Sequence, residues 1–229
     1  MISDRKQLEQ TAVKLGILPF FANNVPGLSV EELVEPGLLF GSSDTPGAWE
    51  WKGPVIRERT TAYGKFFNRK AGFVSRELLP DFLNFRRTYR HPGRLSEAED
   101  AIMSMLRGAG ELTSAQMRAE LFGTGKRTED DLVDILPQES KPSRGILEPA
   151  LQRLQMAGLV LISDFVYKQS KRGERYGWGT ALYSTPEEIY GSDIARCPRS
   201  GSESGRIISE HVLRNFPFAT MDEIKKLLR

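Results

Sequence analysis

The amino-acid sequence predicts an α+β protein that is mostly helical, and three patterns in its 229 residues support this fold class. Apolar side chains recur at helical spacing in several segments, as Leu147, Leu151 and Leu154 do. Strand-like runs occur in pairs around short basic turns, which is the pattern of β-hairpins. The longest apolar run, residues 158–162, is far too short to cross a bilayer, so we do not expect a membrane protein.

Residues 1–93 are predicted to form a helical N-terminal region that carries one β-hairpin. Helical segments are predicted at 4–16, 29–36, 49–60 and 76–89, with a buried apolar connector at 17–21. Strands are predicted at 62–67 and 71–75 around the basic turn Asn68-Arg69-Lys70. The run His91-Pro92-Gly93 is a break that separates this region from the next.

Residues 94–192 have the order of elements that is typical of a winged helix, the helix-turn-helix variant with a β-hairpin wing. Helices are predicted at 96–107, 112–122 and 146–158, a polar loop at 123–143 with a helical turn at 129–136, and strands at 159–167 and 176–184 around the basic turn 168–175. The third helix ends at Gly158 and runs directly into a strand. In a DNA-binding winged helix the third helix enters the major groove and the wing contacts the backbone or the minor groove.

Residues 193–229 are predicted to be a linker followed by C-terminal helices. A short helix at 185–190 precedes this part, and 196–205 has the composition of a linker. Two further helices are expected at 204–215 and 220–228, and Thr220 is expected to cap the second. The predicted fold is therefore a winged helix with a C-terminal helical extension.

Composition and motifs disfavour several kinds of site. Cys197 is the only cysteine and the chain has two histidines, so we expect no disulfide, no metal site and no catalytic thiol. A P-loop, a GxGxxG motif after a strand, HExxH and GxSxG are absent, and no cofactor is expected. Residues 1–7 lack the apolar segment of a signal peptide, so the expected location is cytoplasmic.

Charge is distributed unevenly along the chain, although the formal net charge is only +2. Residues 52–94 contain eleven Lys or Arg and three acids, whereas residues 95–140 contain ten acids and four bases. A segregated basic block is the electrostatic footprint of a polyanion, or alternatively a solvated surface that is rich in arginine. Together with the winged helix, the basic block makes duplex DNA the expected partner.

Candidate nucleic-acid contacts lie on the third helix and on both hairpins. Gln and Arg read base edges by paired hydrogen bonds, and cations at a hairpin tip can neutralise phosphates. The expected contacts are Arg144, Gln152 and Arg153 on the helix, Lys168, Lys171, Arg172 and Arg175 on the wing, and Lys65, Arg69 and Lys70 on the first hairpin. The same helix face carries Gln155 and also Glu148, which disfavours phosphate approach. In a winged helix that binds protein, these charges are only a solvated face.

Aromatic residues are interleaved with basic residues in the N-terminal region. Trp49, Trp51 and Tyr63 could stack bases, although aromatic residues in a short hairpin more often form its core. Glu58 is the carboxylate nearest this cluster in sequence and the one candidate for a catalytic polar group. The stacking and core interpretations differ in the exposure of the aromatic rings.

Several short runs resemble a group of bacterial proteins that are named AlkZ-related. These runs are Trp49-Glu-Trp-Lys52, Ala62-Tyr-Gly-Lys-Phe-Phe67, Lys70-Ala-Gly-Phe-Val-Ser75, Leu154-Gln-Met156, Tyr176-Gly-Trp178 and Tyr183-Ser-Thr-Pro-Glu187. The resemblance covers most of residues 5–192 and implies kinship with AlkZ, a bacterial DNA glycosylase built from tandem winged helices. It implies that residues 1–93 form a second, divergent winged helix with hairpin 62–75 as its wing. The Gln-x-Gln or Gln-x-Asp motif of such enzymes occurs nowhere in this sequence, so no catalytic residue is carried over.

Three hypotheses for the function follow from the sequence. The first is a nucleic-acid-binding protein without catalysis, either a DNA-binding regulator or a damage-recognition factor. The second is a protein-interaction scaffold that uses the acidic stretch 95–140 and the C-terminal helices as contact surfaces. The third is a DNA glycosylase of AlkZ type that acts on alkylated or crosslinked bases, which requires a pocket for an extruded base and a group that directs water.

Overall fold

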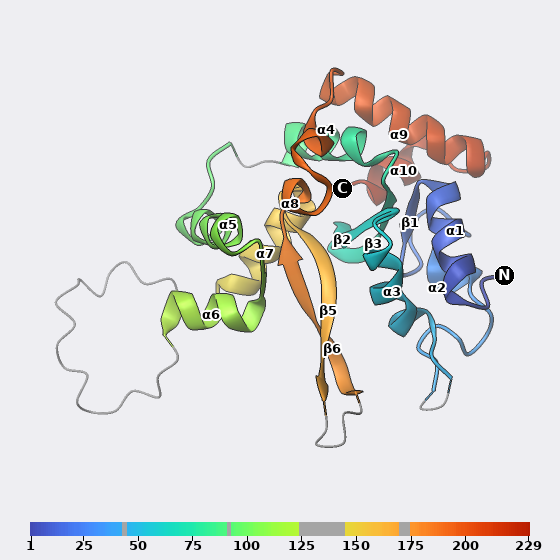
Figure 1. Ribbon diagram of the computed structural model, residues 1–229. Coiled ribbons are helices and arrows are strands. Elements are labelled where there is room, and N and C mark those ends of the chain that lie inside the picture. Colours follow the sequence, from blue (N-terminus) through green and yellow to red (C-terminus); the bar gives the residue numbers. More distant parts are fainter. Residues whose placement is uncertain (43–44, 91–92, 124–144, 170–174) are drawn as a thin grey trace, which may run out of the picture.

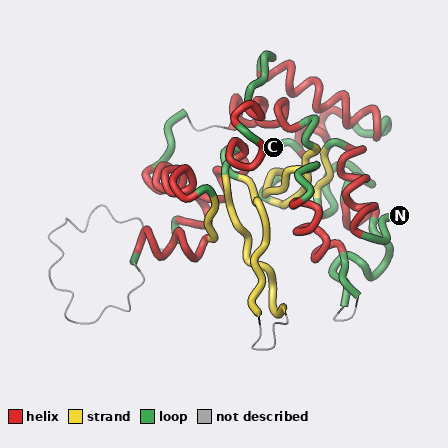
Figure 2. The backbone as a smooth tube through the Cα atoms, in the orientation of Figure 1, coloured by secondary structure: helices red, strands yellow, loops and turns green. Residues whose placement is uncertain are grey.

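The computed structural model describes residues 1–42, 45–90, 93–123, 145–169 and 175–229 (Figure 1). Helices and two small antiparallel sheets form an α+β fold, as the sequence predicted. Roughly half of the chain is helical. Helices surround the two sheets, and the longer hairpin projects away from the body of the molecule (Figure 2).

The first series of elements spans residues 5–75. It comprises α1 (Arg5–Leu15), β1 (Ile17–Pro19), α2 (Val30–Leu33), α3 (Ala48–Arg57), β2 (Thr61–Phe67) and β3 (Lys70–Ser75). The strands form an antiparallel sheet of order β1-β3-β2. The predicted hairpin is confirmed, and the predicted connector is in fact an edge strand, because Ile17 pairs with Val74.

The second series of elements spans residues 97–184 and has the same order as the first. It comprises α5 (Glu97–Ala109), β4 (Glu111–Thr113), α6 (Ser114–Phe122), α7 (Leu147–Met156), β5 (Leu161–Gln169) and β6 (Arg175–Ser184). Its sheet has the order β4-β6-β5, so in both sheets the last strand of the series is central. The predicted capping box of Ser96 and Glu99 starts α5. The helical turn expected at 129–136 lies outside the described residues.

The C-terminal helices complete the core of the first series. The remaining elements are α4 (Leu79–Arg90), α8 (Pro186–Tyr190), η2 (Ser192–Ala195), α9 (Gly201–Asn215) and α10 (Met221–Leu227). Helix α9 packs along α4, as Figure 1 shows. Ile208, Val212 and Leu227 are buried in the same apolar cluster as Phe66 and Phe82. Residues 201–228 are therefore part of the core of the first series.

The linker predicted at 196–205 is wrong in its second half, because α9 begins at Gly201. Ser200 and Glu203 form a capping box in which the Ser200 hydroxyl accepts from the Glu203 N–H. The two glycines that indicated a linker allow α9 to approach α4 closely. A Cβ at Gly201 would lie 2.5 Å from Thr88, and a Cβ at Gly205 would lie 2.9 Å from Phe85.

Two further apolar clusters complete the interior. One joins the outer part of the first series to the hairpin β5–β6, because Ile162 and Phe165 pack with Val55, Ile56 and Tyr63. The other lies among α5, α6 and α7. The hairpin of the second series is thus anchored on the first series, beside α3.

Candidate nucleic-acid interface

The tip of hairpin β2–β3 presents the exposed cations that the sequence predicted there. Asn68 and Arg69 have φ angles of 48° and 66°, so a two-residue turn in the left-handed region reverses the chain. Lys65, Arg69 and Lys70 are exposed. Among the described residues no carboxylate pairs with any of the three, and the Lys70 Nζ reaches only the carbonyl of Ala22, at 3.4 Å. The tip therefore carries three cations that are free to neutralise anions.

The same hairpin packs on the C-terminal end of α7. The backbone N–H of Lys65 donates to the Oε1 of Gln155 at 3.0 Å, and the N–H of Arg69 donates to the Sδ of Met156 at 3.4 Å. Gln155 is 1% exposed and its Nε2 donates to the carbonyl of Leu151. Gln155 therefore does not lie on the open face of α7, where the sequence placed it, because its amide is used to hold the hairpin.

The outward face of α7 is largely occupied by ion pairs. The Nε of Arg153 donates to the Oε1 of Glu99 at 2.7 Å, and Glu148 pairs with Arg118. Gln152 is half-buried. Two of the predicted nucleic-acid contacts lie on this helix. The side chain of Arg153 is paired with Glu99 of α5, whereas Gln152 takes part in no ion pair.

Hairpin β5–β6, the predicted wing, has one cation whose side chain is described. Lys168 is exposed on β5, and Arg175 pairs with Gln169 in the backbone ladder. The expected contacts Arg144, Lys171 and Arg172 lie outside the described residues.

The base of hairpin β5–β6 is joined to α3 and to the residues that follow it. The NH1 of Arg57 pairs with the Oδ1 of Asp164 at 2.9 Å. The NH1 of Arg59 donates to the carbonyl of Ser163 at 3.2 Å. Two cations of the basic block are thus used to join the two series of elements.

Lys52 is the most deeply buried cation at this contact. Its side chain is 3% exposed, and its Nζ lies 3.7 Å from the ring centroid of Trp49 and 4.6 Å from that of Phe165. The ammonium also donates to the carbonyl of Trp49. Burial lowers the Lys52 pKa to about 8, and the nearby carboxylate of Glu50 only partly opposes this shift.

The aromatic residues that could have stacked bases are mainly structural. Tyr63 is 2% exposed, its ring centroid lies 4.8 Å from that of Phe73, and burial raises its pKa. Trp49 and Trp51 are half-buried beside the apolar cluster that joins the first series to hairpin β5–β6. The ring centroids of Trp49 and Phe20 lie 5.4 Å apart in an edge-on contact. The stacking role proposed for Tyr63 is corrected by its position, because both faces of its ring are covered by packing.

Glu58, the candidate catalytic carboxylate, lies on the surface. It forms an ion pair with Arg5 at 2.9 Å, and the two side chains are 47% and 46% exposed. Glu58 is thus a solvated carboxylate paired with a cation, and it lacks the apolar surroundings that are typical of a general base.

Not every cation of the basic block of residues 52–94 lies on the surface. Arg86 is fully buried, and its guanidinium donates to the carbonyls of Phe66 and Leu228. Burial and the nearby charge of Arg90 lower the Arg86 pKa to about 9. With Lys52 and Arg57 also used internally, the charge count of this block overstated the positive surface.

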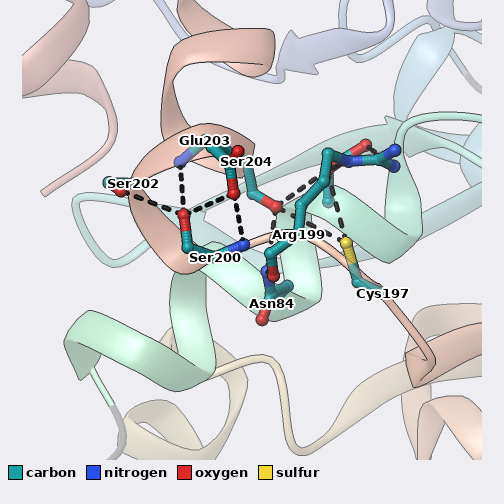
Figure 3. Close-up of polar contacts among 8 residues, drawn as sticks. Asn84, Cys197, Arg199, Ser200, Ser202, Glu203 and Ser204 are labelled. Carbon is teal, nitrogen blue, oxygen red and sulfur yellow. Dashed lines mark hydrogen bonds and ion pairs between the residues drawn. The ribbon is translucent and has the colours of Figure 1, made fainter.

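A polar cluster that the sequence did not predict joins α4 to the start of α9 (Figure 3). The carboxylate of Asp81 accepts from the Nε and NH2 of Arg199, both at 2.7 Å, and from the Ser204 Oγ at 2.8 Å. Asn84 donates to the Ser204 Oγ, and the Cys197 thiol donates to Asp81. Burial alone favours the neutral acid, but the hydrogen bonds from Arg199 and Ser204 outweigh it and lower the Asp81 pKa. The partners are more than 100 positions apart, so no local pattern could indicate them.

Metal sites and membrane spans are not found in the described part of the chain. No group of three or more His, Cys, Asp or Glu there could hold a metal ion. No helix among the described residues is both long and apolar enough to span a membrane.

Comparison with known proteins identifies the family. The chain resembles the Streptomyces sahachiroi DNA glycosylase AlkZ in fold, with a TM-score of 0.51 and 12% sequence identity. The match covers 96% of this chain and 58% of the glycosylase chain, so this chain spans less than two thirds of that protein. A search of curated proteins found no match. The family model described as AlkZ related matches residues 2–229, which include the C-terminal helices, and the chain therefore belongs to the AlkZ-related family.

Proposed function

We propose that this chain is a cytoplasmic DNA-binding protein, and that the cations at the tip of hairpin β2–β3 contact the phosphates of duplex DNA. The observation that carries the proposal is the group of exposed cations Lys65, Arg69 and Lys70 on hairpin β2–β3, none of which pairs with a carboxylate among the described residues. Lys168 on the wing adds a fourth exposed cation. The fold likeness to a protein named a DNA glycosylase supports a role on DNA.

Both series of elements are, in this proposal, winged helices. Each runs helix, short strand, helix, helix and hairpin, and in each sheet the last strand is central. That order is the one expected of a helix-turn-helix with a β-hairpin wing. Hairpin β2–β3 is then the wing of the first unit and β5–β6 the wing of the second.

A salt titration tests the proposal. Each phosphate that a cation neutralises contributes about 0.9 to the slope of log K against log salt, so three contacts contribute about 2.7. The triple variant Lys65→Ala/Arg69→Ala/Lys70→Ala should bind a labelled duplex about tenfold or more weakly at 0.1 M salt, and its slope should be flatter by about that amount. Fluorescence anisotropy measures both quantities.

The matched control removes three exposed cations elsewhere. Arg214, Lys225 and Lys226 lie on α9 and α10, and all three are exposed. Their replacement by Ala lowers the net charge equally but should leave the affinity within about twofold, because general charge attraction is screened at this salt concentration. Equal losses in the two triple variants would reject the hairpin tip as the interface. Absence of binding to duplex and single-stranded DNA would reject the function and favour a protein-interaction scaffold.

A DNA glycosylase is a second candidate, and the fold likeness to AlkZ is the observation that favours it. The described residues do not strengthen it, because Glu58 is a surface ion pair and Tyr63 is buried. Incubation with duplexes that carry alkylated purines or a crosslink, followed by cleavage of abasic sites, measures base release. Base release above the spontaneous rate would establish glycosylase activity, and release that persists in Glu58→Gln would show that another group is catalytic. No release by a protein that binds the duplexes would reject the glycosylase hypothesis.

A further inference from the structure

The two series of elements hold each other through equivalent parts. Strand β5 of the second series packs on α3 of the first, strand β2 of the first packs on α7 of the second, and the two strands contact each other. Helices α3 and α7 occupy the same third-helix position in their series, and β2 and β5 both begin the hairpin. Each third helix is thus covered by the hairpin of the other series.

Helix α3 is closed along the side that meets the wing. A Cβ at Gly53 would lie 3.6 Å from the ring of Phe165, so the wing already rests on the helix backbone at this point. Lys52 is 3% exposed beneath the same ring, and Arg57 is paired with Asp164. The side chains that a groove-reading helix would offer to bases are therefore used within the chain.

Helix α7 is closed in the corresponding way. Gln155 is bonded to the N–H of Lys65, and Met156 accepts from the N–H of Arg69. Arg153 and Glu148 are held by ion pairs with α5 and α6, respectively. Base reading in the major groove needs paired donors and acceptors on an open helix face, and α7 keeps only Gln152 for that purpose.

We infer that α3 and α7 are mutual docking helices rather than groove readers, so that this protein contacts the phosphate backbone of DNA and does not read base sequence through its third helices. The inference rests on the proposed DNA-binding function. The predicted contacts that remain available among the described residues, Lys65, Arg69, Lys70 and Lys168, are exposed cations on the two hairpins, and phosphate contacts position a protein without carrying sequence information. The class of ligand is therefore any duplex of sufficient length.

A reversible disulfide tests whether the helices must be released for DNA to bind. The Cβ built at Gly53 lies 4.0 Å from the Cβ of Phe165, which is within the range of a disulfide. In a Cys197→Ser background, the variant Gly53→Cys/Phe165→Cys can be oxidised to lock the wing on α3 and reduced to free it. We expect the two forms to bind a labelled duplex within about twofold of each other. A loss of tenfold or more on oxidation, restored by dithiothreitol, would overturn the inference, because it would show that α3 has to open.

A panel of unrelated duplexes tests the same point without new cysteines. We expect affinities within about threefold across sequences of equal length, and Gln152→Ala should leave every one of them unchanged. The triple variant at the hairpin tip should weaken all of them by the same factor. A thirtyfold preference for one sequence that Gln152→Ala abolishes would refute the docking role of α7 while leaving DNA binding intact. Absence of binding to every duplex would instead reject the proposed function on which the inference rests.

Discussion

Replacement of the buried Lys52 by Met should change how the stability of the protein depends on pH. Lys52 is 3% exposed, and burial lowers its pKa from the ordinary value of 10.5 to about 8. Between these two values the unfolded chain binds a proton that the folded chain does not, so the contribution of Lys52 to stability rises with pH. At pH 7 burial of the charged Lys52 side chain lowers the free energy of unfolding by about 3 kcal/mol relative to a solvated lysine, because the pKa falls from 10.5 to about 8 and each unit of pKa corresponds to about 1.4 kcal/mol.

The magnitude can be worked out for an accessible pH range. Between pH 7 and pH 9.5 the cost should fall by about 2 kcal/mol, since most of the folded protein loses the Lys52 proton while most of the unfolded chain keeps it. Met fills a similar volume and sulfur packs well against the rings of Trp49 and Phe165. The variant should therefore gain stability relative to wild type at pH 7 and lose about 2 kcal/mol of that gain by pH 9.5. All other groups titrate in both proteins, so their contributions cancel in the difference between the two free energies of unfolding.

Urea unfolding at pH 7, 8, 9 and 9.5 measures this difference directly. Lys225→Met is a matched control, because Lys225 is exposed on α10 and its gap to wild type should not change with pH. A gap between wild type and Lys52→Met that stays constant from pH 7 to pH 9.5 would refute the argument, since it would mean that the Lys52 ammonium remains fully solvated.

Two other predictions concern the junction of α4 and α9. Gly201→Ala should destabilise the protein by about 1–3 kcal/mol in chemical unfolding, because the new Cβ would lie 2.5 Å from Thr88. Gly108→Ala in α5, where no atom lies within 4 Å of the new Cβ, should instead stabilise it by up to about 1 kcal/mol, and equal effects of the two would contradict this view of the junction. Asp81→Ala should cost about 2 kcal/mol at pH 7, or roughly 4–8 °C in Tm, because Ser204 and Arg199 lose their charged acceptor. The Asp81 pKa is lowered in the folded state, so this stabilisation is present above the unfolded pKa of about 3.9 and lost as pH falls through the folded value. A Tm difference that does not shrink as the pH falls below about 3.9 would speak against it.

Local patterns predicted the elements of the fold well because their causes are local. The capping box at Ser96 and Glu99 starts α5 where the sequence placed it, and the hairpin around Asn68 and Arg69 forms through a turn of two adjacent residues. The edge strand at Ile17 was missed because three residues give no period, and its strand character comes from pairing with Val74. The start of α9 was also missed, although its capping box of Ser200 and Glu203 is local, because the glycines around it suggested a linker.

The candidate site was predicted less well because its contacts join remote parts of the chain. Gln155 has helical spacing that suggests an exposed position, but the hydrogen bond to Lys65 spans 90 positions and buries it. Arg86 counts as positive charge in any sequence window, although the core of the first series encloses it. The exposed tip at Arg69 and Lys70 was predictable, because a two-residue turn between strands leaves its side chains in solvent.

The contact between Arg86 and the C-terminal helices bears on how the chain folds during synthesis. The guanidinium that supports Phe66 in β2 also binds the carbonyl of Leu228, and the intervening second series has its own apolar cluster. The apolar cluster around Phe66 and Phe82 is therefore completed only when residues 201–228 have left the ribosome. Until then the part of the α4 and β2 surface that these helices cover is open to chaperones or to wrong contacts with other nascent chains. A core that begins with early residues is thus finished by the C-terminal helices.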